Sequence, residues 1–164
     1  MSLERDGFRR RCRQFRLLAW FMIASVGGLL ALMTVVGPAY LVATGERAAE
    51  ASMLRGLVWH LPALFYLYGV WAIGEAVGQI GRGRLIQTAT AEGLRRAGLA
   101  LGVGGVLSVF VVVNLMRLVM PGAGGYLHFD IGGMTLGMVG GAMFLLGRVM
   151  DRAAAVQSEL DEMV

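Results

Sequence analysis

Four long apolar runs separated by short charged segments constrain this chain more than any other feature. The first covers residues 17–45 without a charged side chain, and the predicted spans lie at about residues 17–41, 57–78, 98–116 and 131–150. A helix rises about 1.5 Å per residue, so roughly 20 apolar residues cross the hydrocarbon core of a bilayer. The apolar core of a signal peptide has only about 7–15 residues, so the first run is predicted to be a retained span. The sequence therefore predicts a single all-α integral membrane domain, with four transmembrane helices in two hairpins.

Composition agrees with lipid as the main solvent of this chain. Hydrophobic residues make up 57% of the 164 residues and charged residues only 16%, which is too apolar for a soluble domain of this size. The net charge of +4 comes from arginines that stand at the ends of the apolar runs, where membrane topology already accounts for them. Direct nucleic-acid binding is therefore not expected. The only cysteine is Cys12, so no intramolecular disulfide forms.

The arginines also predict an orientation. Six of them precede residue 17, and the segment 79–97 holds Arg82, Arg84, Arg95 and Arg96, whereas the two other links hold only Arg47, Arg55 and Arg117. Positively charged residues are retained on the cytoplasmic side of a membrane. The segment 79–97 is thus predicted to be a cytoplasmic loop. Both termini, with an acidic tail at 151–164, are also predicted to face the cytoplasm, so that the protein is N-in and C-in.

Glycines recur at four-residue spacing in the last predicted span. Gly133, Gly137 and Gly141 share one helix face, and such ridges of small residues let two helices approach closely in lipid. Two interpretations stay open: packing within one chain as a four-helix bundle, and a homodimer through this ridge.

Two charged residues lie inside the predicted spans. Glu75 in the second span and Arg148 in the fourth fall at similar depth near the cytoplasmic interface, so we predict a structural ion pair between them. The alternative is that Glu75 reaches Arg82 or Arg84 at the end of its own helix.

The two histidines, His60 and His128, are both expected near the outer face. A b-type haem held between helices requires two facing imidazoles, so these residues define an alternative function as a haem- or quinone-binding redox subunit. No phosphate-binding loop, zinc-protease motif, nucleophile elbow or metal-ligand spacing is present. The chain is accordingly predicted to be non-enzymatic, with no cofactor and no metal in the favoured interpretation.

Two stretches resemble a known family. They are YLYGVWAIGEAVGQIGRGRLIQTATAEGLRRAG in the middle of the chain and FDIGGMTLGMVGGAMFLLGRVMDRAAAVQSELDEMV at its end. Both are similar to the bacterial membrane proteins grouped as domain of unknown function 2975, although Leu85 stands where the family's loop phenylalanine is expected and Leu160 replaces an asparagine of its tail. The resemblance implies a multi-pass protein of the bacterial inner membrane, often encoded beside a small helix-turn-helix regulator. It brings no catalytic residues.

The favoured function is a regulatory subunit that binds a protein partner through its cytoplasmic face. In the absence of that partner, we expect the acidic tail residues Glu159, Asp161 and Glu162 to dock against Arg82, Arg84, Arg95 and Arg96. A small transporter or channel component, with Glu75 accessible to water, is a further alternative.

Overall fold

The computed structural model describes residues 2–44, 48–82, 86–119 and 129–162. Arg84 and His128 therefore lie outside the described residues, as do the side chains of Asp161 and Glu162. Within the described ranges every regular element is helical. In chain order the elements are α1 (Ser2–Ala31), the π-helical segment η1 (Leu32–Val36), α2 (Gly37–Ala43), α3 (Ala48–Trp59), α4 (Leu61–Gly81), α5 (Ile86–Val106), the π-helical segment η2 (Leu107–Val111), α6 (Val112–Val119) and α7 (Ile131–Glu162).

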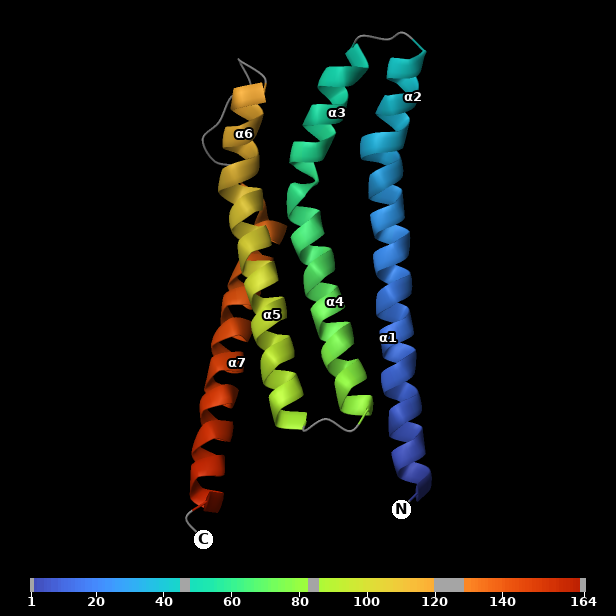
Figure 1. Ribbon diagram of the computed structural model, residues 1–164. Coiled ribbons are helices and arrows are strands. Elements are labelled where there is room, and N and C mark those ends of the chain that lie inside the picture. Colours follow the sequence, from blue (N-terminus) through green and yellow to red (C-terminus); the bar gives the residue numbers. More distant parts are fainter. Residues whose placement is uncertain (1, 45–47, 83–85, 120–128, 163–164) are drawn as a thin grey trace.

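Four helices are long and apolar enough to cross a membrane, at Arg10–Ala43, Leu61–Gly81, Gln87–Leu118 and Ile131–Glu159. The prediction of an all-α chain with four such helices is confirmed. The chain runs up through α1 and α2, down through α3 and α4, up through α5 and α6 and down through α7, so both ends of the chain lie at the same end of the molecule (Figure 1).

Prolines explain two local departures from regular helix. Pro38 has no N–H to donate to the carbonyl four residues earlier, and η1 widens the helix directly before it. Pro62 lies at the start of α4, directly after a break in the second span at which His60 leaves the helical conformation with φ −92° and ψ 2°. No proline lies within the two turns that follow η2, and nothing else in the sequence marks that segment.

The segment 79–97, predicted to be a loop, is mostly helical over its described residues, while its cytoplasmic position stays a prediction. Helix α4 continues to Gly81 and α5 begins at Ile86. The polar composition of the segment suggested a loop, but small residues make it a packing surface: Ala89, Ala91 and Ala97 are buried, with at most 1% of each exposed.

The helices form an open row rather than a closed four-helix bundle. Helix α1 packs on α4, α4 packs on α5 and α5 packs on α7, while the upper segments α2, α3 and α6 continue the same order. Figure 1 shows this order across the molecule. Large apolar side chains are exposed along the row, such as Leu118 (82%) and Met138 (79%). A predicted bundle is thus corrected to a row with two faces available to lipid.

The closest packing in the row joins α5 to α7, which run antiparallel. A Cβ atom at Gly105 would lie 2.6 Å from the Gly133 oxygen and 2.6 Å from the Gly137 Cα. A Cβ at Gly140 would lie 2.7 Å from the Gly98 oxygen. The two backbones are therefore in direct contact, because no side chain stands between them.

The small face of α7 differs from the predicted ridge. Residues 133, 137, 140 and 147 meet α5, whereas a Cβ at Gly141 would find nothing within 4 Å. This alternation of four and three residues is the spacing that keeps two nearly parallel or antiparallel helices in contact. Residues at a strict four-residue spacing move progressively around the helix and leave the contact. The prediction that Gly141 packs against another helix is therefore wrong, and Gly140 occupies that contact. Since Gly133 and Gly137 face α5 of the same chain, a homodimer through these two positions would have to displace α5.

Candidate functional site

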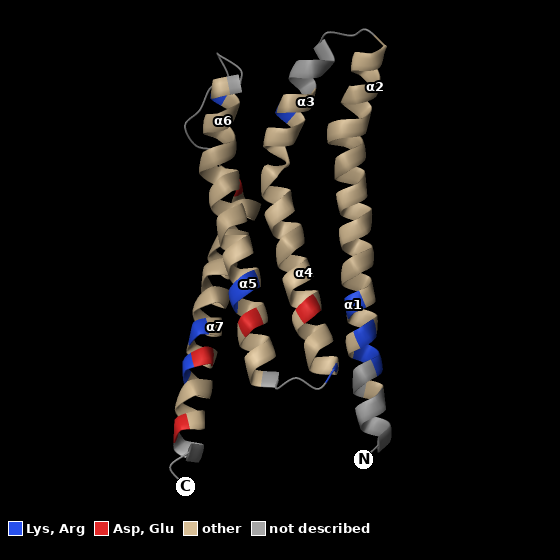
Figure 2. Cartoon of the chain, viewed as in Figure 1, with Lys and Arg blue, Asp and Glu red and all other residues tan. Residues whose placement is uncertain are grey.

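Charged side chains gather at the end of the row where both termini lie. Figure 2 marks charged residues on the lower turns of α1, α4, α5 and α7, with few at the opposite end. The concentration follows from the sequence, since the uncharged run of the first span begins directly after Arg16. We call this region the charged end and define it by the described residues Arg10, Arg11, Arg13, Arg16, Glu75, Arg82, Glu92, Arg95, Arg96, Arg148, Asp151, Arg152 and Glu159.

Glu75 pairs with its own helix end and not with Arg148. The Arg82 Nη2 donates to the Glu75 Oε1 at 2.9 Å, and the Arg82 Nε donates to the Gly78 oxygen at 3.3 Å. The predicted Glu75–Arg148 pair is therefore not present, because α5 separates α4 from α7 in the row (Figure 1). Arg148 instead lies with its guanidinium 6.0 Å from the ring centre of Phe144.

Further ion pairs join described residues of the charged end. Arg95 of α5 donates to the Asp151 Oδ2 of α7 at 3.2 Å, and Arg96 donates to Glu92 one turn earlier in α5. Both arginine side chains remain about half exposed, at 50% and 46%. Exposed ion pairs stabilise a fold by only about 0–1 kcal/mol, so these contacts exchange readily.

The expected docking of the acidic tail stays a prediction for Asp161 and Glu162, whose side chains lie outside the described residues. Helix α7 continues to Glu162, which carries Glu159 about 12 Å beyond Asp151 along the helix axis. Among the acidic residues of α7 whose side chains are described, Asp151 reaches the arginines of α5 and Glu159 does not. Asp151 is not among the predicted site residues, although the sequence carries a signal for it. The spacing of four and three continues from Gly140 through residue 144 and Gly147 to position 151.

His60 sits at the break between α3 and α4. Its Nδ1 lies 2.8 Å from the Gly56 oxygen, and because a carbonyl only accepts, this contact requires the proton on Nδ1 and leaves Nε2 as the basic nitrogen. His128 lies outside the described residues, so the pairing of the two imidazoles around a haem stays a prediction. Within the described ranges no three His, Cys, Asp or Glu residues gather in a geometry that could hold a metal ion.

A hydrogen bond between two side chains lies at the start of α7, away from the charged end. The Ser108 hydroxyl of η2 donates to the Asp130 Oδ2 at 2.6 Å, and the Asp130 backbone oxygen accepts the first α7 hydrogen bond, from the Met134 nitrogen at 2.9 Å. The carboxylate thus stands at the positive end of the α7 dipole. We assign it a structural role, which ties the end of α7 to the third span.

These features define a multi-pass membrane protein with charged residues gathered at one end and an apolar body. The family model described as "Protein of unknown function (DUF2975)" matches residues 38–164. The chain belongs to this family, as the resemblance indicated. A search of curated proteins and a search of solved structures each found no match.

Proposed function

We propose that this protein is a non-enzymatic, multi-pass protein of the bacterial inner membrane that binds a soluble protein partner through its charged end. The observation that carries the proposal is the length of α7. Its 32 residues span about 48 Å, whereas the hydrocarbon core is about 30 Å thick. Helix α7 is therefore long enough to project its last turns into water.

The projecting part of α7 has the chemistry of a protein-binding surface. Asp151 is partly exposed and Arg152, Gln157 and Glu159 are exposed, and the neighbouring turns of α5 add Arg95 and Arg96. Charges of both signs favour a folded protein partner with its own mixed charges, because such pairing fixes orientation and speeds encounter. The weak Arg95–Asp151 and Arg96–Glu92 pairs are available for exchange with it.

The arginine distribution supports a cytoplasmic position for this surface, since positive residues are retained on that side. A soluble cytoplasmic protein is then the expected partner. A small DNA-binding regulator is the first to test, because the family resemblance implies such a neighbour.

Photocrosslinking in living cells tests the proposal. A photoreactive amino acid replaces Glu159 at the projecting end of α7, and in a matched variant it replaces Met138 on the same helix, whose side chain is 79% exposed within the apolar body. We expect a discrete protein adduct from position 159 and only lipid adducts from position 138.

Mass spectrometry of the adduct identifies the partner. A second substitution, Asp151→Asn, should lower the yield of the same adduct at position 159 if the charged end makes the contact. Equal protein adducts at both positions, or none at position 159, would contradict the proposed function.

A further inference from the structure

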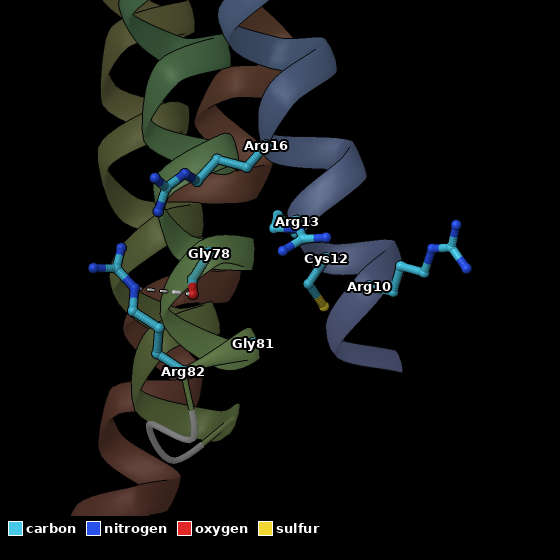
Figure 3. Close-up of a pocket in the computed structure, with 7 residues that line it drawn as sticks. All are labelled: Arg10, Cys12, Arg13, Arg16, Gly78, Gly81 and Arg82. Atoms are coloured by element: carbon cyan, nitrogen blue, oxygen red, sulfur yellow. Dashed lines mark hydrogen bonds between the residues drawn. The ribbon is translucent and has the colours of Figure 1, made fainter. Parts of the chain in front are cut away.

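A cavity of about 420 Å³ lies between α1 and α4 at the charged end. Arg10, Arg13 and Arg16 of α1 and Arg82 at the end of α4 line it, together with one cysteine and two glycines. Figure 3 shows these residues and the two helices that carry them. The cavity has the size of a small-molecule site, and we call it the arginine pocket.

Gly78 creates the room in which two of the guanidinium groups converge. A Cβ atom on Gly78 would lie 2.8 Å from the Arg16 Cδ, 3.4 Å from the Arg16 Nη1 and 3.7 Å from the Arg82 Nη2. The Arg16 side chain reaches from α1 across to α4 at this level (Figure 3). Two positively charged groups therefore approach the same point on the α4 backbone, where the missing side chain of Gly78 leaves room for them.

The positive charge of the arginine pocket is poorly compensated. Glu75 neutralises Arg82, but within the described part of the chain Arg10, Arg13 and Arg16 make no ion pair. Converging like charges repel one another, and an anion placed between them removes this cost. Guanidinium groups match the oxygens of a phosphate group, with two parallel hydrogen bonds each.

The position of the pocket along the helices indicates that the phosphate group belongs to a lipid. Arg16 directly precedes the uncharged run of the first span, and Arg82 directly follows the end of α4. From Arg10 to Arg16 the helix rises about 9 Å, which compares with a headgroup region of roughly 5–8 Å on each side of a bilayer. The lining arginines are thus placed at the depth of lipid phosphates.

We propose that the arginine pocket binds the phosphate group of an anionic phospholipid. Basic pockets between membrane helices are suited to such headgroups. Helix α1 stands at the edge of the row and packs, among the long helices, on α4, so a lipid headgroup held by Arg16 and Arg82 fastens this edge helix to the rest of the protein. This inference is independent of any protein partner.

Binding of phosphatidylglycerol to the purified full chain tests the proposal. The protein is prepared in maltoside micelles, and lipid retention is followed by native mass spectrometry during titration with phosphatidylglycerol or with phosphatidylcholine. We expect tight binding of one phosphatidylglycerol and at least tenfold weaker binding of phosphatidylcholine. Inorganic phosphate is added in a parallel experiment. If millimolar phosphate displaces the lipid, dissolved phosphate also binds at this site. If it does not, the site binds the phosphate group only as part of the lipid.

Three variants distinguish a specific lipid-binding site from nonspecific attraction between anionic lipid and the positive charge of the helix end. Arg16→Gln removes a pocket charge, Gly78→Ala keeps the charge but fills the space beside Arg16, and Arg11→Gln removes an exposed charge that does not line the pocket. We expect at least tenfold weaker phosphatidylglycerol binding for the first two and unchanged binding for the third. Circular dichroism melting in maltoside checks that each variant is folded.

The proposal is overturned if folded Arg16→Gln binds phosphatidylglycerol as tightly as the unaltered chain. It is also overturned if Arg11→Gln weakens binding as much as Arg16→Gln, because the lipid then responds only to the total charge of the helix end.

Discussion

At the scale of single residues, the glycines of α5 and α7 fall into two kinds according to what stands opposite them. A Cβ on Gly98 would overlap the backbone of Phe144 and Gly140, whereas a Cβ on Gly141 would meet nothing within 4 Å. Overpacking against backbone is expensive because a helix must move as a unit. Substitution by alanine is therefore expected to destabilise the protein at Gly98 and to be tolerated at Gly141.

Gly98→Ala is expected to destabilise the protein by about 1–3 kcal/mol, the usual cost of forcing an extra carbon into a packed contact. Gly141→Ala should leave stability unchanged or raise it slightly, since alanine favours helix by up to about 1 kcal/mol in water. Unfolding by sodium dodecyl sulfate in mixed micelles measures both. Equal stabilities of the two variants would mean that α5 and α7 do not pack through Gly98.

At the scale of elements, the same spacing organises the contact between α1 and α4. A Cβ on Gly74 would lie 3.0 Å from the Ala19 Cβ, one on Gly78 would lie 2.8 Å from the Arg16 Cδ, and one on Gly81 would lie 3.0 Å from the Cys12 Cβ. The steps of four and three residues repeat those between α5 and α7. Antiparallel helices in lipid are thus joined twice in this chain by small residues at coiled-coil spacing.

Gly81→Cys should form a disulfide with the natural Cys12 on mild oxidation. The Cβ atoms of a disulfide lie about 3.5–4.5 Å apart, so a small outward shift from the 3.0 Å contact at Gly81 suffices. Loss of both free thiols, measured by maleimide labelling after denaturation, detects the bond.

Gly74→Cys is the matched control for this bond. It lies on the same face of α4 but opposite Ala19, so both thiols should stay free. A bond from position 74 and none from position 81 would show that the register of α1 against α4 is shifted by two turns.

At the scale of the whole molecule, the open row places the charged end at one end and the last residues of α2 and α6 at the other (Figure 1). Thr44 stands at the end of α2 and Gln157 in the last turns of α7, and both side chains are exposed. With the charged end in the cytoplasm, these two positions would lie on opposite sides of the membrane.

Single cysteines at these two positions test the sidedness, in a chain whose Cys12 is replaced by serine. Thr44→Cys should react with a membrane-impermeant maleimide added to spheroplasts, and Gln157→Cys should react only after the membrane is permeabilised. The reverse pattern would place the charged end outside and remove the basis for a cytoplasmic partner.

The sequence by itself determined the class of this protein, the number of its long apolar helices and the position of its charges. These properties depend on composition along the chain, and four apolar runs admit little besides helices, because every backbone polar group in lipid must be bonded within its own helix. The same local information located Glu75 and offered Arg82 as one of its partners.

Only the tertiary structure decided which faces meet. In a soluble protein the apolar face of a helix marks its buried side, but here the lipid-facing side chains, such as Met138, are as apolar as the packed ones. Small residues are the remaining signal, and they occur on more than one face, so Gly140 and not Gly141 could be chosen only once α5 lay beside α7. The same placement separated Glu75 from Arg148, brought Asp151 to Arg95 and set Arg16 over Gly78, because each of these contacts depends on the order and register of helices in the row.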